Sequence, residues 1–190
     1  MKKKSILYVI VRPLIVFFTK CFLTPKFKGL ENIPKNGRIV LAGTHTNNLD
    51  CLLLICATKR EVHFLAKQEL FKGPFGFIFN NLGLIAVDRQ THTLDAFGTA
   101  KKYLEMDEVI GIFPEGTTEK TGVILPFKKG ACRMAYDTNS KIVPFVIKGK
   151  YRLWSRNLEI EFYKPRKVES KFIVEETRKL RDFIVSKKEG

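Results

Sequence analysis

The stretch RIVLAGTHTNNLD, residues 38–50, runs from an apolar segment into a polar loop that carries His45 and Asp50. Its apolar part, residues 39–42, predicts a buried strand, because a short apolar run is followed by polar and loop-forming residues. Residues 49–58 contain no Gly or Pro and predict a helix that begins near Asp50. A strand joined by a short loop to a helix is the repeating unit of α/β proteins, so this stretch sets the predicted fold class.

The same alternation of strand and helix patterns continues along the chain. Further strands are predicted at residues 62–66, 84–87, 109–113, 142–147 and 158–163. Further helices are predicted at residues 93–106, 130–137 and from 170 onward, whereas residues 71–79 form either a loop or a short helix. The pattern predicts an α/β fold: a single domain with a mostly parallel central sheet that is flanked by helices. A chain of 190 residues can build one such core.

The N-terminus, MKKKSILYVIVRPLIVFFTKCFL, places three lysines before a mostly apolar segment. Arg12, Pro13 and Lys20 interrupt this segment, and a charge in the middle of a bilayer costs about 3 kcal/mol or more. We therefore expect an amphipathic helix that lies in the membrane interface rather than one that spans it. Its apolar residues recur at helical spacing: Ile6, Val9, Ile10, Leu14, Phe17, Phe18, Cys21 and Phe22. The alternative is a helix that packs on the protein's own core.

The net charge of +15 is concentrated at the two ends of the chain. Residues 1–30 carry seven Lys or Arg and no acid, and residues 141–190 carry fourteen bases against seven acids. Such a basic surface favours an anionic partner, and a merely solvated face is the alternative for the C-terminal part. We expect a phospholipid surface and no nucleic acid, because no nucleic-acid-binding motif is present. The four cysteines form no CxxC pair, so we expect free thiols and no metal site.

Three polar clusters follow predicted strands: His45 with Asp50, Asp88 with Arg89, and residues 114–117. Ligands of parallel α/β sheets bind beyond the carboxyl ends of the strands, so these clusters should open on one edge of the sheet. A histidine can remove a proton from a hydroxyl group near neutral pH, and a carboxylate on its other ring nitrogen fixes the tautomer. Serine is scarce near this loop, so the histidine would activate a substrate hydroxyl rather than a serine nucleophile.

The other polar residues at this edge suit an anionic, hydroxylated substrate. The guanidinium of Arg89 can bind a phosphate through two donors, or it can form a surface ion pair with Asp88. Glu115 can accept hydrogen bonds from substrate hydroxyl groups, or it can serve as a loop carboxylate. Lys128, in LPFKKG, adds a cation for a phosphate or for lipid headgroups.

Five blocks occur in an order and spacing that resemble the glycerolipid acyltransferase family, in particular the 1-acylglycerol-3-phosphate acyltransferases. They are THTNNLD (44–50), GLIAVDR (83–89), FPEGT (113–117), LPFKKG (125–130) and IVPFVIKG (142–149). The resemblance implies that His45 and Asp50 are catalytic and that Arg89 holds the phosphate of the acceptor. It also implies that the FPEG block, with Glu115, Gly116 and the adjoining Thr117, binds the glycerol part of the acceptor, and that Val143 and Pro144 line the acyl side.

The chain departs from the family pattern at three positions. The family usually has Asn before the His and Ser two residues after it, where this chain has Thr44 and Asn47, and it usually has Arg where this chain has Thr118. Because Thr118 carries no positive charge, Arg89, Lys120 or Lys128 would have to bind the phosphate in its place.

The resemblance implies a membrane-associated enzyme on the cytoplasmic side of the bilayer. It would transfer a fatty acyl group from acyl carrier protein or coenzyme A to the free hydroxyl of a lysophospholipid, most closely 1-acylglycerol-3-phosphate, and would form phosphatidic acid without a cofactor. Residues 1–24 would be the membrane-associating helix and residues 25–190 the acyltransferase domain. Three alternatives remain open: transfer to another lyso-lipid, hydrolysis of a thioester or lipid, and lipid binding without catalysis.

Overall fold

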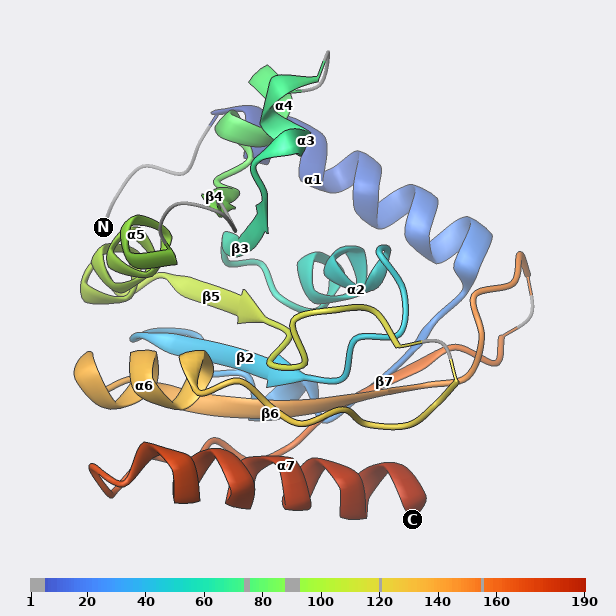
Figure 1. The fold of residues 1–190 in the computed structure, drawn as a ribbon. Coiled ribbons are helices and arrows are strands. Elements are labelled where there is room, and N and C mark those ends of the chain that lie inside the picture. Colours follow the sequence, from blue (N-terminus) through green and yellow to red (C-terminus); the bar gives the residue numbers. More distant parts are fainter. Residues whose placement is uncertain (1–5, 74–75, 88–92, 120, 155) are drawn as a thin grey trace.

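A seven-stranded sheet forms the centre of the computed structural model, which describes residues 6–73, 76–87, 93–119, 121–154 and 156–190 (Figure 1). Its strands are β1 (Lys26–Lys28), β2 (Ile39–Gly43), β3 (Val62–Lys67), β4 (Ile85–Val87), β5 (Val109–Ile112), β6 (Lys141–Lys148) and β7 (Glu159–Phe162). They lie in the order β1-β7-β6-β2-β5-β3-β4. All neighbouring strands are parallel except β6 and β7, so the predicted mostly parallel α/β sheet is confirmed.

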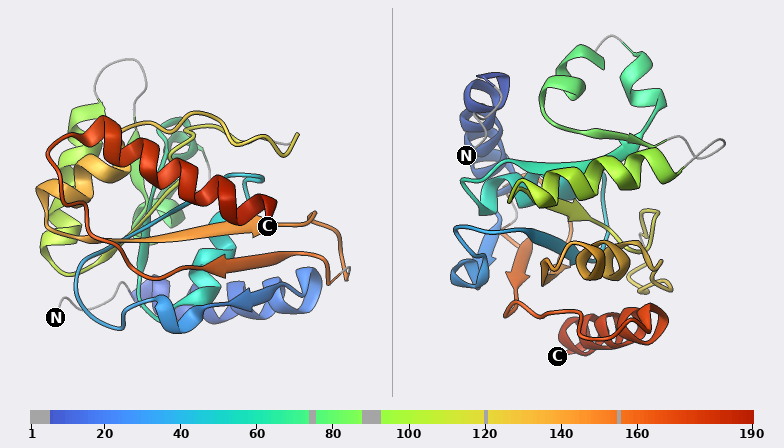
Figure 2. Two further views of the ribbon diagram at one scale, coloured as in Figure 1. Left: turned by 90° about the horizontal axis from the view of Figure 1, so that it is seen from below. Right: turned by 90° about the vertical axis from the view of Figure 1, so that its left-hand side faces the viewer.

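Helices cover both faces of this sheet (Figures 1 and 2). They are α1 (Ile6–Phe18), which continues into the π-helical turn η1 (Thr19–Leu23), α2 (Asp50–Ala57), α3 (Glu69–Lys72), α4 (Gly76–Asn81), α5 (Thr93–Glu105), α6 (Gly130–Asp137) and α7 (Ile173–Glu189), together with the 3-10 turn η2 (Leu30–Asn32). The helices α5, α6 and α7 pack on one face, and α1 and α2 pack on the other. The helical covering on both sides explains why β2 and β5 are apolar at every position.

The strand β2 lies at the centre of the sheet, between β5 and β6, and all five of its residues are buried. Val40 and Ala42 belong to the core beneath α5, α6 and α7, whereas Ile39 and Leu41 belong to the core beneath α1 and α2. This alternation follows from the period of two in a strand. Each large aliphatic side chain buried in this way contributes about 1.5–3 kcal/mol to folding, so β2 is a rigid base for the loop that follows it.

The structure differs from the sequence prediction mainly at the edge strand β1. No strand was predicted in this part of the chain, but β1 pairs in parallel with β7 from Lys26 opposite Glu159 onward. Its side chains alternate between exposed lysines and a half-buried Phe27, and Lys28 Nζ lies 3.0 Å from Glu159 Oε2. Three residues with two lysines carry almost no apolar pattern, so the strand depends on pairing with β7 rather than on a local signal.

The N-terminal helix turns its apolar stripe away from the protein. The side chains expected on that stripe are exposed, from 74 % for Ile6 to 38 % for Phe22. Tyr8 and Arg12 face the protein instead: the Tyr8 hydroxyl donates to the Arg60 carbonyl (3.0 Å), and Arg12 Nη2 donates to the Thr58 carbonyl (2.8 Å). The stripe therefore does not pack on the protein's own core. By length and composition alone, Ile6–Leu23 is also sufficient to cross a membrane.

Candidate active site

The loop between β2 and α2 brings His45 and Asp50 together. His45 Nδ1 lies 3.0 Å from Asp50 Oδ2, and the same oxygen accepts hydrogen bonds from the backbone amides of Thr46 (2.6 Å) and Asn47 (2.9 Å). The Asp50 side chain is fully buried. A buried carboxylate is stable only when hydrogen bonds replace its hydration. The loop sequence supplies these donors because it turns around the carboxylate at the start of α2.

A tyrosine that no sequence motif identifies, Tyr151, completes the surroundings of Asp50. The Tyr151 hydroxyl donates a hydrogen bond to Asp50 Oδ1, which also accepts one from the Thr46 hydroxyl (3.3 Å). Burial and the negative charge of Asp50 raise the pKa of Tyr151 above its ordinary range, so the hydroxyl stays a donor at alkaline pH. Tyr151 comes three residues after β6 ends at Lys148. Its place beyond the carboxyl end of a strand was the only available signal.

The imidazole of His45 is held on one side and accessible on the other. Its ring stacks on Phe113, with centroids 4.1 Å apart and an interplanar angle of 16°. The side chain is 17 % exposed, and Nε2 has no hydrogen-bond partner among the described residues. Because Nδ1 faces a carboxylate, the neutral ring carries its proton on Nδ1 and leaves Nε2 as an acceptor. This geometry suits removal of a proton from a bound hydroxyl group.

Glu115 clamps the backbone of the histidine loop. Its Oε1 accepts from the His45 amide and its Oε2 from the Leu125 amide, both at 2.9 Å, and the residue is only 5 % exposed. The His45 carbonyl in turn accepts from the Glu119 amide at 2.8 Å. The described contacts of Glu115 are thus with the backbone, and its role toward substrate hydroxyl groups stays a prediction.

The predicted Lys128 lies against the same loop. Gly116 has φ +71°, and a Cβ at this position would lie 2.7 Å from Lys128 Nζ. Glycine is therefore favoured by the left-handed backbone, and its lack of a side chain leaves room for the lysine. The Lys128 amide donates to the Pro114 carbonyl at 2.8 Å, and Thr117 is exposed beside this turn. The structure thus brings a cation and a hydroxyl group to the loop that clamps His45.

The predicted acyl-side residue, Pro144, lies inside the sheet. It stands opposite Ala42 in the β2–β6 pairing, is buried, and accepts a hydrogen bond at its carbonyl from the Tyr163 amide (2.9 Å). Val143 is also buried. The described contacts of Val143 and Pro144 are those of core residues, and their contact with an acyl chain stays a prediction.

Thr44 and Gly43 explain how β2 delivers the histidine. Thr44 Oγ1 accepts a hydrogen bond from the Ile147 amide at 2.9 Å, which ties the loop to β6. At Gly43, an added Cβ would lie 2.1 Å from the Phe145 carbonyl oxygen, so a side chain cannot fit there. The Thr at position 44, where the family usually has Asn, therefore has a structural contact in this chain.

Two further predictions concern Arg89 and a metal site. Arg89, with Asp88 and Lys120, lies outside the described residues, so the phosphate role of Arg89 remains a prediction. Within the described ranges, no group of three or more His, Cys, Asp or Glu is placed to hold a metal ion.

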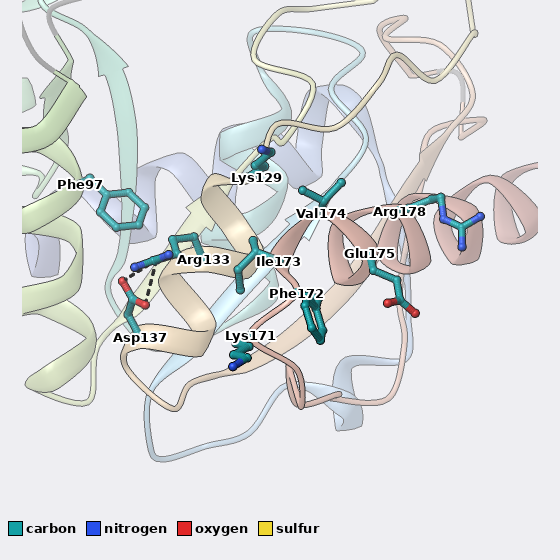
Figure 3. Close-up of a pocket in the computed structure, with 10 residues that line it drawn as sticks. All are labelled: Phe97, Lys129, Arg133, Asp137, Lys171, Phe172, Ile173, Val174, Glu175 and Arg178. Carbon is teal, nitrogen blue, oxygen red and sulfur yellow. Dashed lines mark hydrogen bonds and ion pairs between the residues drawn. The ribbon is translucent and has the colours of Figure 1, made fainter.

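A large cavity lies away from the histidine, between α5, α6 and the start of α7 (Figure 3). Its volume is about 1040 Å³, and neither His45 nor Asp50 lines it. This cavity could not be predicted from the sequence, because its lining comes from segments far apart in the chain.

The fold and the site together define an α/β protein with a carboxylate–imidazole pair at the carboxyl edge of a parallel sheet, an arrangement suited to general-base chemistry. The chain belongs to the acyltransferase family: the family model described as "Acyltransferase" matches residues 24–148. The family resemblance seen in the sequence is thereby confirmed. The match includes His45, Asp50, Glu115 and Lys128 within its range.

Individual relatives agree with this assignment. A 1-acyl-sn-glycerol-3-phosphate acyltransferase of Borreliella burgdorferi is 32 % identical over 133 residues, which are 68 % of this chain and 53 % of that protein. The enzyme of the same name from Bacillus subtilis is 31 % identical over 121 residues, or 63 % of this chain and 60 % of that protein. The match thus spans little more than half the length of these two relatives.

A solved structure shares the fold. The crystal structure of the 1-acyl-sn-glycerophosphate (LPA) acyltransferase PlsC from Thermotoga maritima superimposes with a TM-score of 0.80 at 22 % identity, covering 100 % of this chain and 83 % of that one. At this level of identity the similarity establishes the fold alone.

Proposed function

We propose that this protein transfers a fatty acyl group from an acyl thioester to the free hydroxyl of a lysophospholipid, most closely 1-acylglycerol-3-phosphate. The observation that carries the proposal is His45 Nδ1 at 3.0 Å from the buried Asp50, with Nε2 left accessible. The names of the relatives, which are 1-acyl-sn-glycerol-3-phosphate acyltransferases, support the choice of acceptor.

The reaction proceeds by direct transfer. Nε2 of His45 accepts the proton of the acceptor hydroxyl while the hydroxyl oxygen attacks the thioester carbonyl carbon. The tetrahedral intermediate collapses, the carbon–sulfur bond breaks, and the departing thiolate takes the proton from the imidazolium. Asp50 holds the Nδ1 proton and stabilises the imidazolium. No acyl-enzyme and no cofactor take part.

The surrounding residues hold the acceptor. Lys128 and Arg89 bind its phosphate, because both cations follow strands that end at the catalytic edge of the sheet. The turn of Glu115, Gly116 and Thr117 contacts its glycerol part, and Pro144 lies on the acyl side. Hydroxyl and ammonium groups near one turn suit a small, charged, hydroxylated headgroup.

The segment of residues 1–24, which contains α1 and η1, holds the protein on a phospholipid surface at the cytoplasmic side, and residues 25–190 form the acyltransferase domain. The exposed apolar stripe of α1, with three lysines before it in the sequence, supports this placement. Substrate and product are both lipids, so a catalytic edge close to the headgroups shortens the path between bilayer and site.

Product analysis with the purified protein tests the proposal. The protein is incubated with acyl thioester in the presence and absence of 1-acylglycerol-3-phosphate, and phosphatidic acid and free fatty acid are quantified. We expect phosphatidic acid to form only with the acceptor and little free fatty acid without it. Rapid thioester cleavage without acceptor would indicate a hydrolase. Lipid binding without turnover on any lyso-lipid would indicate a binding module.

A further inference from the structure

The cavity between α5, α6 and α7 is called the α6–α7 groove below. Ten residues line it (Figure 3). They are Phe97, Lys129, Arg133, Asp137, Lys171, Phe172, Ile173, Val174, Glu175 and Arg178. None of them takes part in the site described above.

The charge of the α6–α7 groove is positive and incompletely neutralised. Its two acids are already paired: Asp137 lies 3.0 Å from Lys101 and 3.0 Å from Arg133, and Glu175 lies 3.0 Å from Lys179. Burial raises the pKa of Asp137, but the hydrogen bonds and charges of Lys101 and Arg133 together outweigh burial and hold that pKa below its ordinary value. The Asp137 carboxylate therefore remains ionised and paired.

Three cations of the groove are not neutralised by these acids. Lys129, Lys171 and Arg178 form no ion pair with any described carboxylate, and all three are exposed. Cations gathered in this way attract an anionic partner and accelerate its association.

Apolar side chains stand among these cations. Phe172 is 65 % exposed and Val174 is 62 % exposed, although both border the start of α7, where Ile173 between them is buried. An exposed aromatic ring surrounded by charged residues is typical of the centre of a protein–protein interface.

The position of the groove favours a soluble partner over the membrane. The helices that form it pack on the face of the sheet opposite to α1 (Figures 1 and 2). When the exposed stripe of α1 lies on a bilayer, the groove therefore faces away from the lipid.

One end of the groove adjoins the active-site loop. Lys129 directly follows Lys128, which lies over Gly116, and a Cβ added at the next residue, Gly130, would lie 3.7 Å from Ile112 Cδ1 at the end of β5. Ile112 directly precedes Phe113, the ring that stacks on His45. A partner seated in the groove is thus close in structure to the loop that holds the histidine.

We propose that the α6–α7 groove docks an acidic carrier protein that delivers the acyl thioester on a flexible arm. The inference rests on the proposed function and deepens it, because it selects acyl carrier protein over coenzyme A as the donor that this surface recognises. Acidic side chains of the carrier pair with Lys129, Lys171 and Arg178, and its apolar contacts cover Phe172.

Kinetics with two donors test the docking surface. The variant Lys171→Glu/Arg178→Glu is compared with the parent protein, with acyl-acyl carrier protein and acyl-coenzyme A of the same chain length. We expect the KM for acyl-acyl carrier protein to rise about tenfold or more, because two attractive contacts become repulsive. The kcat and the KM for acyl-coenzyme A should stay within about twofold of the parent, because neither residue touches the active site.

A matched control separates local contact from overall charge. Lys141→Glu/Lys164→Glu makes the same charge change at two exposed lysines that do not line the groove. This control should retain the parent KM for both donors. An unchanged KM for acyl-acyl carrier protein in the groove variant, or an equal rise for both donors, would overturn the docking proposal.

A binding measurement keeps the inference independent of catalysis. Holo-acyl carrier protein is titrated onto the parent and the groove variant, and the dissociation constant is measured by calorimetry. Binding to the parent that weakens about tenfold in the variant is expected. No binding to the parent, or a groove variant that loses vesicle binding instead, would overturn it. Absence of acyl transfer from either donor would contradict the proposed function alone.

Discussion

At the scale of single residues, the arrangement depends on how Asp50 is satisfied. This buried carboxylate accepts hydrogen bonds from two backbone amides, the Thr46 hydroxyl and the Tyr151 hydroxyl, and it faces the His45 ring. Hydrogen bonds to a charged group contribute about 1.5–3 kcal/mol each. The orientation of the imidazole is therefore fixed by a carboxylate that has little freedom to move.

Tyr151→Phe should weaken catalysis without weakening substrate binding. Removal of the hydroxyl leaves Asp50 Oδ1 with the longer Thr46 hydrogen bond alone, so the orientation of His45 becomes looser. We expect kcat to fall about tenfold, equivalent to one such hydrogen bond at the low end of its range, with KM values for both substrates nearly unchanged. Tyr136→Phe, at an exposed tyrosine, is the matched control. A parent-like kcat in Tyr151→Phe would show that Asp50 is held sufficiently without it.

Lys128→Ala should affect the lysophospholipid acceptor and not the donor. The ammonium group lies at the Gly116 turn, beside the clamp on His45, where a phosphate would gain a charge-assisted hydrogen bond. We expect the KM for 1-acylglycerol-3-phosphate to rise about tenfold, with the thioester KM unchanged. Lys164→Ala, at an exposed lysine beyond β7, serves as the control. Equal effects on both substrates, or none, would remove Lys128 from the phosphate site.

At the scale of elements, β2 and the loop before α6 position the histidine from two sides. The first holds it through Gly43 and Thr44, and the second through Glu115. The second loop is itself fastened to α7, because Arg181 donates to the carbonyls of Ile124 (2.8 Å) and Leu125 (3.2 Å). A shift of the backbone at the end of β2 should therefore displace His45 and the loop that is hydrogen-bonded to it.

Gly43→Ala tests the close approach of β2 and β6. The added methyl group would meet the Phe145 carbonyl at 2.1 Å, so the strands must separate. Overpacking of this kind costs about 1–3 kcal/mol, and we expect a free energy of unfolding in urea that is lower by that amount. Gly98→Ala, in α5 with nothing within 4 Å of the new methyl, should instead raise it by up to about 1 kcal/mol. Unchanged stability of Gly43→Ala would contradict the described packing.

Most elements could be predicted from the sequence because their signals are local. The apolar runs of β2, β5 and β6 are long enough to mark buried strands, and the spacing in α5 marks a helix. The edge strand β1 could not be found because it has only three residues and depends on β7. Tyr151 could not be assigned either, because its hydrogen bond to Asp50 spans 101 residues of sequence and leaves no local pattern.

At the scale of the whole molecule, the two surfaces for which we propose different partners lie on opposite faces of the sheet. α1 packs on one face, and α5, α6 and α7 pack on the other (Figure 1). His45 comes two residues after β2 ends at Gly43, at the carboxyl edge of the sheet. Periodicity could not decide whether the stripe faced lipid or core, because both environments require the same spacing. The hydrogen bonds of Tyr8 and Arg12 show which side of α1 meets the protein.

Leu14→Glu/Phe17→Glu should release the protein from vesicles that contain anionic lipid. Both side chains are more than half exposed on α1, and burying each in a lipid interface contributes about 1.5–3 kcal/mol. We expect flotation with vesicles to fall at least tenfold while circular dichroism remains that of the parent. Val123→Glu/Leu153→Glu changes two equally exposed apolar residues outside α1 and should float normally. Undiminished flotation of the α1 variant would rule out the stripe as the membrane contact.

The rate of acyl transfer by purified His45→Ala decides whether His45 is the general base. We expect kcat to fall by a factor of about 10²–10⁴, the usual contribution of a general base, with the fold retained. Asn48→Ala, at an exposed position of the same loop, should keep the parent rate. Transfer by His45→Ala at the parent rate would mean that another group removes the proton, and that the carboxylate–imidazole pair is not the catalytic centre.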